Sequence, residues 1–134
     1  PRAEPAAGAA VEIRFTRGGG AIRSRARFAD RVDADVIIDT GASLTAISDR
    51  LAAELGLDLR KPERTLSVNT ANGRVTAPVV LLANVDVAGA RVTHVEAVVL
   101  QLLGDDALIG LNFLEHFDLS LDSARGILRL TARR

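Results

Sequence analysis

Alternating apolar and charged residues in the first quarter of the chain predict β-strands. Residues 11–15 alternate in this way, which is the period-two pattern of a half-buried strand. Residues 22–28 resume the pattern after three consecutive glycines, and Asp30-Arg31 turns the chain. Residues 36–38, Val-Ile-Ile, form a short continuous apolar run that ends abruptly at an aspartate, which is typical of a buried strand.

Two β-hairpins are predicted in the middle of the chain. Residues 66–70 and 75–80 flank the segment Ala71-Asn72-Gly73-Arg74, and Asn-Gly is a strong signal for a tight hairpin turn. Residues 81–87 and 92–100 flank Ala88-Gly89-Ala90, which indicates a second turn. We therefore expect four strands over this stretch, joined in two hairpins.

Two short helices are expected among the strands. Ser48 can cap a helix over the residues that follow it, and Gly56 fits just past the end of that helix. Residues 107–110 open a second helical stretch that runs through Phe117, and two strands with a turn between them close the chain over 119–130. The whole pattern predicts an all-β fold with closed or rolled sheets and about two short helices.

The length of 134 residues leaves room for one domain. Residues 1–10 are rich in proline and alanine and have no apolar periodicity, so we expect them to form a linker outside the fold. The folded domain is then expected over residues 11–134. No run of about 18 apolar residues occurs, so no segment of this sequence is predicted to span a membrane.

Composition narrows the functional classes. Seventeen Lys and Arg balance seventeen Asp and Glu, which argues against a nucleic-acid binder because such proteins need a basic excess to neutralise phosphates. The chain has no cysteine, so thiolate metal sites and cysteine nucleophiles are excluded. His94 and His116 are far apart, which makes a zinc site or a Ser-His-Asp triad improbable. We expect no metal and no other cofactor.

The segment directly after the apolar run at 36–38, Asp39-Thr40-Gly41, holds the candidate functional residues. Asp39 follows a strand that should be buried, and a buried carboxylate is costly unless it is hydrogen-bonded or paired. Gly41 lets the backbone bend tightly and bring amide N–H groups towards that carboxylate. Thr40 offers a hydroxyl that can fix the turn to neighbouring backbone. The alternative is that Asp39 merely ends a strand and begins a turn.

These residues resemble the retropepsin-like, or retroviral-type, aspartic proteases, and especially bacterial single-domain members. The resemblance rests on residues 36–43, Val-Ile-Ile-Asp-Thr-Gly-Ala-Ser, and on residues 107–114, Ala-Leu-Ile-Gly-Leu-Asn-Phe-Leu. Between them, residues 70–73 fall where the family carries its flap hairpin. The order and spacing match from about Val11 to Leu130, which is most of the chain.

The resemblance implies a role for the residues of the first motif. Asp39 would be the catalytic aspartate, and Thr40 would interlock with its counterpart across a two-fold axis. Gly41 would present its backbone to the substrate, and Ala42 would lie in the substrate-binding site. Because Ala42 has no hydroxyl to bond a catalytic carboxylate, we expect a rate maximum at mildly rather than strongly acidic pH.

The resemblance also assigns the two later segments. Ile109 and Gly110 would thread beside the catalytic loop as a psi-shaped crossing. Ala71, Asn72 and Gly73 would lie at or near a mobile flap tip that closes over an extended peptide. This flap is polar and lacks the glycine and isoleucine run of viral flaps, so an ordinary tight turn remains an equal interpretation of Asn72-Gly73.

The number of catalytic motifs then predicts the assembly. Aspartic proteases need two carboxylates that share one proton, and this chain has a single Asp-Thr-Gly. An active enzyme must therefore be a symmetric homodimer with one Asp39 from each subunit. Whether the termini interleave into a shared sheet, as they do in viral dimers, stays open.

We thus expect an aspartic endopeptidase that cleaves extended polypeptides. Two alternatives remain, a non-catalytic peptide-binding or dimerisation module with the same fold, and an inactive monomer that clustering activates. By analogy with bacterial relatives, we expect a periplasmic domain tethered to the membrane by a segment upstream of this sequence. The proline- and alanine-rich opening is compatible with the end of such a tether.

Overall fold

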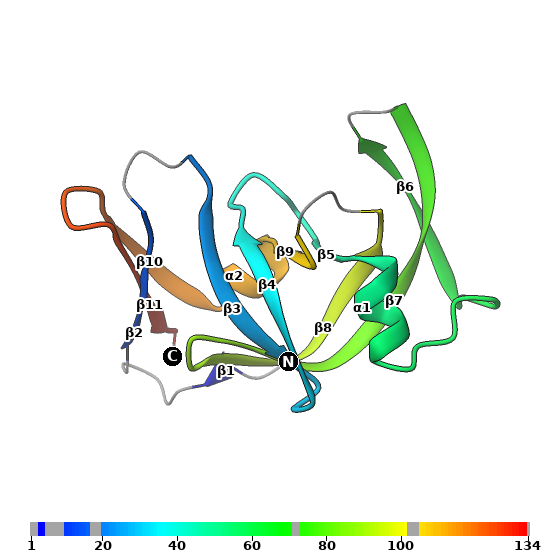
Figure 1. Cartoon of the computed structure of the whole chain (residues 1–134), viewed down its shortest axis with the longest axis horizontal. Coiled ribbons are helices and arrows are strands. Elements are labelled where there is room, and N and C mark those ends of the chain that lie inside the picture. Colours follow the sequence, from blue (N-terminus) through cyan, green and yellow to red (C-terminus); the bar gives the residue numbers. More distant parts are fainter. Residues whose placement is uncertain (1–2, 5–9, 17–19, 71–72, 102–104, 134) are drawn as a thin grey trace.

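Eleven β-strands and two short helices make up the part of the chain that the computed structural model describes, which is residues 3–4, 10–16, 20–70, 73–101 and 105–133 (Figure 1). The strands are β1 (Ala3–Glu4), β2 (Ala10–Arg14), β3 (Ile22–Phe28), β4 (Val32–Ile38), β5 (Thr45–Ile47), β6 (Arg64–Thr70), β7 (Gly73–Val87), β8 (Ala90–Val99), β9 (Ala107–Ile109), β10 (Phe117–Asp122) and β11 (Ile127–Ala132). The helices are α1 (Asp49–Glu54) and α2 (Leu111–Leu114). Neither helix is long and apolar enough to cross a membrane.

Eight of the strands form one sheet that closes on itself. Its order is β1-β8-β5-β9-β4-β3-β7-β6, and β8 also pairs with β7, so six strands from β8 round to β7 make a closed barrel. The remaining strands form a three-stranded antiparallel sheet in the order β10-β11-β2. The prediction of an all-β fold with closed sheets and two short helices is confirmed.

The barrel interior is filled by alternate residues of its strands. In β3, Ala26 and Phe28 are buried while Arg25 and Arg27 point outward, as the period-two pattern predicts. The two sheets share one core, which includes the fully buried rings of Phe28, Phe113 and Phe117. Because Phe113 lies on α2 and Phe117 begins β10, these rings anchor both elements against the barrel.

The opening segment contributes more to the fold than the sequence indicates. Ala3 and Glu4 form β1 and pair with Val92 and Arg91 at one edge of β8. Ala10 begins β2 in the second sheet. Part of the expected linker over residues 1–10 therefore lies in the sheets, since a backbone segment needs no apolar periodicity to add to a free strand edge.

The two predicted hairpins share one long strand. β7 runs without a break over 15 residues, whereas the sequence predicted separate strands over 75–80 and 81–87. The first half of β7 pairs with β6 and the second half with β3 and β8, so no turn is needed between them. Gly73 already pairs with Thr70, so Gly73 and Arg74 lie in the strand rather than in the turn.

The β7–β8 turn is also tighter than predicted. Val87 pairs with Ala90, which leaves only Ala88 and Gly89 to make the turn. Both have positive φ angles, 54° and 100°, as a type I′ turn requires.

The first predicted helix is confirmed, and the second is much shorter than predicted. The Ser48 side chain accepts a hydrogen bond from Leu51 N at 3.0 Å and caps α1, and Gly56 follows α1 with a φ of 73°. Residues 107–109, however, form β9, which pairs in parallel with the end of β4. The helical stretch is limited to α2, because extended Gly110 precedes it and Phe117 already belongs to β10.

Candidate active site

Asp39 lies at the end of β4, next to the parallel strand β9. Val36 and Ile38 are buried, and Ile38 pairs with Ile109. The backbone N–H of Asp39 donates to Ile109 O at 2.9 Å, which extends the ladder by one residue. The Asp39 side chain is half-buried and is therefore held at the edge of the barrel by two packed strands.

The turn after Asp39 directs a backbone amide at the carboxylate. Gly41 N donates to Asp39 Oδ1 at 2.8 Å, and Ala42 N donates to Asp39 O at 3.3 Å. This is the geometry that the Asp-Thr-Gly sequence predicts. Thr40 and Gly41 are both exposed, and Thr40 lies at the outer surface of the turn.

The segment after β9 passes directly beneath this turn. Leu111 N donates to Ala42 O at 2.8 Å, and Asn112 N donates to Ser43 O at 3.2 Å. A Cβ added to Gly110 would lie 2.5 Å from Leu44 O and 2.9 Å from Ala42 O. Position 110 therefore accepts only glycine without a shift of the backbone, and Ile109 and Gly110 lie beside the Asp39 turn, where the resemblance puts them.

Asn112 fixes the same crossing with its side chain, a role that the sequence did not reveal. Its Oδ1 accepts hydrogen bonds from Thr45 N and Thr45 Oγ1, both at 2.9 Å. Its Nδ2 donates to Glu96 O at 2.7 Å, and Thr45 Oγ1 in turn accepts from Gly110 N at 3.2 Å. Thr45 is fully buried, so this network connects β5, β8 and α2 inside the molecule.

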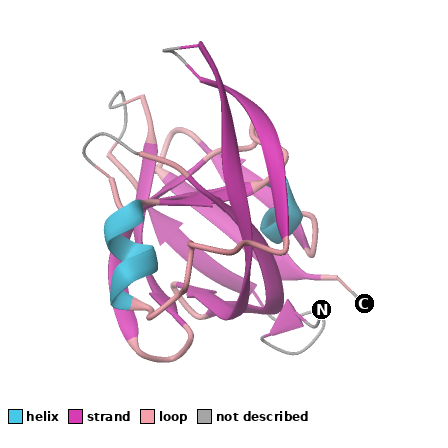
Figure 2. Ribbon diagram, turned by 90° about the vertical axis from the view of Figure 1, so that its right-hand side faces the viewer, coloured by secondary structure: helices cyan, strands magenta, loops and turns pink. Residues whose placement is uncertain are grey.

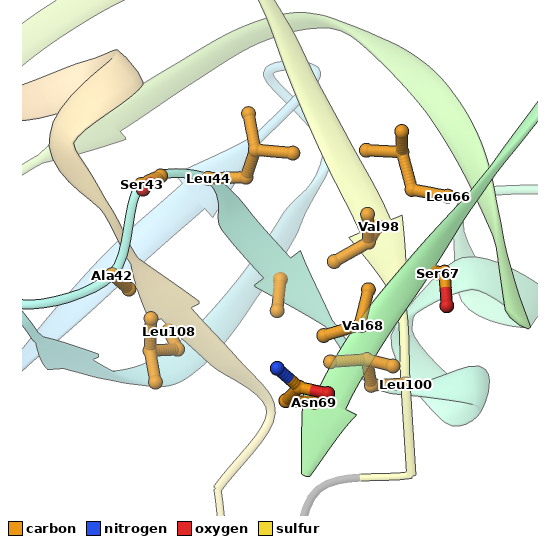
Figure 3. A pocket seen from close by; sticks show the side chains of 11 residues that line it. Ala42, Ser43, Leu44, Leu66, Ser67, Val68, Asn69, Val98, Leu100 and Leu108 are labelled. Atoms are coloured by element: carbon orange, nitrogen blue, oxygen red, sulfur yellow. The ribbon is translucent and has the colours of Figure 1, made fainter. Parts of the chain in front are cut away.

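An apolar cleft opens beside the Asp39 turn (Figure 3). It encloses about 440 Å³, and its walls are the residues after the turn, strand β6, and the ends of β8 and β9. None of the lining residues is charged, and they are Ala42, Ser43, Leu44, Ala46, Leu66, Ser67, Val68, Asn69, Val98, Leu100 and Leu108. The cleft therefore favours uncharged, mostly apolar groups.

The hairpin of β6 and β7 forms one side of this cleft and projects from the body of the molecule (Figures 1 and 2). Of the three residues expected at its tip, Ala71 and Asn72 lie outside the described residues. Gly73 is exposed at the start of β7 and is not part of the cleft lining. Ala42 does line the cleft, whereas the predicted roles of Ala71, Asn72 and Gly73 in substrate binding stay predictions.

The sequence matches a known family of proteases. The sequence model of the family described as "gag-polyprotein putative aspartyl protease" matches residues 25–116, which is more than half of the chain and includes the Asp39 turn, the hairpin and the Gly110 crossing. The chain belongs to this family. None of the curated protein sequences matches the chain.

Solved structures of retropepsin-like proteases have the same fold. One similar structure is a retropepsin-like aspartic protease from Rickettsia conorii, with a TM-score of 0.75 and 28% sequence identity over 92% of this chain and 91% of that one. Another is the simian foamy virus protease, with a TM-score of 0.51 and 17% identity over 69% of this chain and 91% of that one. The retropepsin-like fold and the family resemblance predicted from the sequence are confirmed.

Proposed function

We propose that the chain is an aspartic endopeptidase that acts as a homodimer, with one Asp39 carboxylate from each subunit. The observation that carries this proposal is the Asp39 turn, in which a half-buried carboxylate at a strand end accepts the Gly41 amide beside an apolar cleft. The described hydrogen bond to this carboxylate comes from the backbone and not from a second acid. A partner subunit would supply the second acid.

Two such carboxylates supply both the base and the acid that peptide hydrolysis needs. Two acids about 3 Å apart cannot both ionise, so the pair holds one proton. The ionised carboxylate takes a proton from water, the water oxygen attacks the peptide carbonyl carbon, and the protonated carboxyl gives its proton to the carbonyl oxygen. When the C–N bond breaks, the protonated carboxyl gives its proton to the amine and the other carboxylate takes a proton from a hydroxyl of the diol, so one proton remains on the pair.

The cleft is suited to an extended peptide. β6 is the last strand of the barrel sheet, so one of its edges has no neighbouring strand. A peptide that runs along such an edge can form strand-like hydrogen bonds, while its side chains enter pockets. The uncharged lining of the cleft favours an apolar side chain near the cleaved bond.

The test is a peptide-library digest with Asp39→Asn and, as a matched control, Asp49→Asn. Asp49 is an exposed aspartate in the first turn of α1. We expect Asp39→Asn to lower cleavage by about 100- to 10,000-fold, since it removes the acid–base pair, and Asp49→Asn to change it little. Unchanged cleavage by Asp39→Asn would contradict the proposal.

Mixing the two proteins tests the shared site directly. Excess Asp39→Asn protein captures wild-type subunits in mixed dimers that hold a single aspartate, so the activity of the wild type should fall as the variant is added. Excess Asp49→Asn protein should not lower it. Peptide binding without any cleavage would indicate a binding module, and activity that appears only at high protein concentration would indicate a monomer activated by clustering.

The cellular location also belongs to the proposal. We propose a periplasmic domain tethered by an upstream segment, as in bacterial relatives of this type. Its support is the proline- and alanine-rich composition of residues 1–10.

A further inference from the structure

The β6–β7 hairpin carries a single charged side chain beside the cleft. Residues 65–85 of the sequence contain one charged residue, which is Arg74. Arg74 lies near the start of β7, is exposed, and pairs with Asn69 of β6. Asn69 lines the cleft, and none of the lining residues is charged. The hairpin therefore places one positive charge at the border of an uncharged cleft.

The guanidinium of Arg74 is held over β6. Its Nε–H donates to Ser67 Oγ at 2.6 Å, so the side chain crosses from β7 to β6. Ser67 lies on the part of β6 that borders the cleft, as Asn69 does (Figure 3). A side chain whose orientation is already fixed loses less conformational freedom when it binds a partner. The hydrogen bond to Ser67 therefore prepares Arg74 to bind a group at the edge of the cleft.

Arg74 has no acidic partner within the part of the chain that the structure describes. Most of the described arginines form an ion pair with an aspartate or a glutamate. Arg64, at the other end of the hairpin, is one of them and pairs with Glu96 at 3.1 Å. The bond to Ser67 uses only one of the five N–H donors of the Arg74 guanidinium. Its two Nη groups are directed to no carboxylate among the described residues.

A peptide that pairs with the free edge of β6 would present its side chains to this charge in a fixed order. Successive side chains of a strand point to opposite faces, and residues directly opposite in neighbouring strands point to the same face. Along β6, half-buried Leu66 and Val68 alternate with exposed Ser67 and Asn69. A peptide side chain beside Val68 would enter the apolar cleft. The next side chain along the peptide would lie on the face of Asn69 and Arg74.

We propose that Arg74 is a specificity-determining residue, which selects peptides with an aspartate or a glutamate directly next to the apolar residue that enters the cleft. This inference rests on the proposed function, because it names the substrate class of the same site. The two Nη groups would bind the peptide carboxylate in a bidentate ion pair, and paired N–H···O bonds of this kind are among the strongest that a guanidinium forms.

The same charge determines which peptides are disfavoured. A lysine or an arginine next to the apolar residue would bring a like charge to the same face of the sheet, and like charges at neighbouring positions are destabilising. A glutamine there would gain no ion pair and meet no repulsion. The expected order of cleavage is therefore acidic, then uncharged, then basic.

A peptide series with one variable position tests this order. Each peptide contains a single apolar residue with Glu, Gln or Lys on one side of it, and a second series varies the other side. We expect wild-type kcat/KM to be about two- to fivefold higher for Glu than for Gln in one series, as for an ion pair at an exposed site, and this ratio to fall in high salt. Arg74→Gln should bring the ratio close to one, and Arg74→Glu should make Lys the favoured residue.

Arg31→Glu is the matched control for the change of net charge. Arg31 is an exposed arginine in the turn between β3 and β4, does not line the cleft, and donates to the backbone carbonyl of Glu54. We expect Arg31→Glu to keep the wild-type Glu-to-Gln ratio. Equal changes of the ratio in Arg31→Glu and Arg74→Glu would overturn the inference, because net charge rather than the position of Arg74 would then select the peptide.

Binding of the same peptides to Asp39→Asn protein, followed by fluorescence anisotropy, separates this inference from the proposed function. If the wild type cleaves through Asp39 while the Arg74 variants keep the wild-type order of peptides, the inference is wrong and the function stands. If Asp39→Asn protein prefers Glu peptides, an added Arg74→Glu reverses that preference, and the wild type cleaves none of them, the inference stands and the function fails. A protein that neither binds nor cleaves the peptides overturns both.

Discussion

The Asp39 turn is kept in place by neighbours that do no chemistry themselves. Asn112 accepts from the N–H and the hydroxyl of buried Thr45 and donates to Glu96 O, while Gly110 passes close to Leu44 O and Ala42 O. In the proposed dimer, the Asp39 carboxylate must be placed within a fraction of an ångström, and such placement needs supporting residues whose own positions are locked. We therefore regard Asn112 as a positioning residue.

Removal of the Asn112 amide should loosen the turn and the fold together. Asn112→Ala leaves the buried N–H of Thr45 without its acceptor, and an unsatisfied buried donor costs about 1–3 kcal/mol. We expect the free energy of unfolding to fall by that amount, and kcat to fall more than KM rises. Asn112→Asp keeps the acceptor and loses only the donor, so it should recover part of kcat. Equal losses of kcat in the two variants would contradict a positioning role.

The turn that brings the Gly41 amide to the Asp39 carboxylate could be predicted from the sequence, whereas the hydrogen bonds of Asn112 could not. A carboxylate after three β-branched residues and before Thr-Gly is expected at the start of a turn, because Gly41 lets the backbone bend and bring an amide to it. The partners of Asn112 lie on β5 and β8, 67 and 16 positions away in the chain. The sequence shows only that a polar side chain lies between Gly110 and Phe113. It does not indicate which residues that side chain bonds.

At the scale of elements, the β6–β7 hairpin forms one side of the cleft in which we propose that a peptide binds. In the outer half of the hairpin, β6 and β7 pair only with each other, because the first residues of β7 pair with β6 and only later residues also pair with β8. Val68 lines the cleft and pairs with Val75, so both side chains lie on the face that is turned to the cleft. Val75 is 38% exposed and has room to cover a bound peptide.

Loss of the apolar group at position 75 should weaken peptide binding without unfolding the protein. Val75→Ser removes apolar surface that is already partly exposed, so the melting temperature should change little. Contact with a bound peptide is lost, and we expect KM to rise about threefold to tenfold, in line with the loss of roughly 1 kcal/mol of apolar burial. Leu81→Ser, at an exposed apolar residue of the same strand that does not line the cleft, serves as the control. A lower melting temperature with unchanged KM would show that Val75 is structural.

Local signals predicted the hairpins and α1 but not the elements whose identity depends on distant strands. Ala107–Ile109 is too short to show a helical or a strand period, and it is a strand because β4 lies parallel to it. β7 is continuous because different halves of it have different partners, a fact that no local pattern contains. Pro78 within β7 adds to the ambiguity, since proline usually interrupts a strand.

At the scale of the whole molecule, exposed ion pairs surround the barrel although the net charge is zero. Arg25 and Arg27 on β3 each form an ion pair with an aspartate of β4 at 2.8 Å. This face of the sheet therefore exposes pairs of opposite charges to the solvent. The hydrogen bond from Arg27 holds the pKa of Asp33 below its usual value. The hydrogen bonds from Arg91 lower the pKa of Asp30 in the same way.

These shifts make the stability of the fold depend on pH in the acid range. A carboxyl whose pKa is lower in the folded state stabilises it fully above the unfolded-state pKa of about 4, and the contribution is lost as pH falls through the folded value. We expect the urea midpoint to be constant near pH 6 and to fall below pH 4, so that the expected rate maximum lies at mildly acidic pH, where the fold is still intact. Arg27→Gln should make this dependence less steep, because Asp33 then loses the hydrogen bond that contributes most to its lowered pKa. Arg31→Gln should leave it unchanged, since Arg31 bonds the backbone carbonyl of Glu54 and no carboxylate. A midpoint that rises on acidification from pH 5 to 3, or a rate that peaks near pH 2, would show that other groups govern the acid limit.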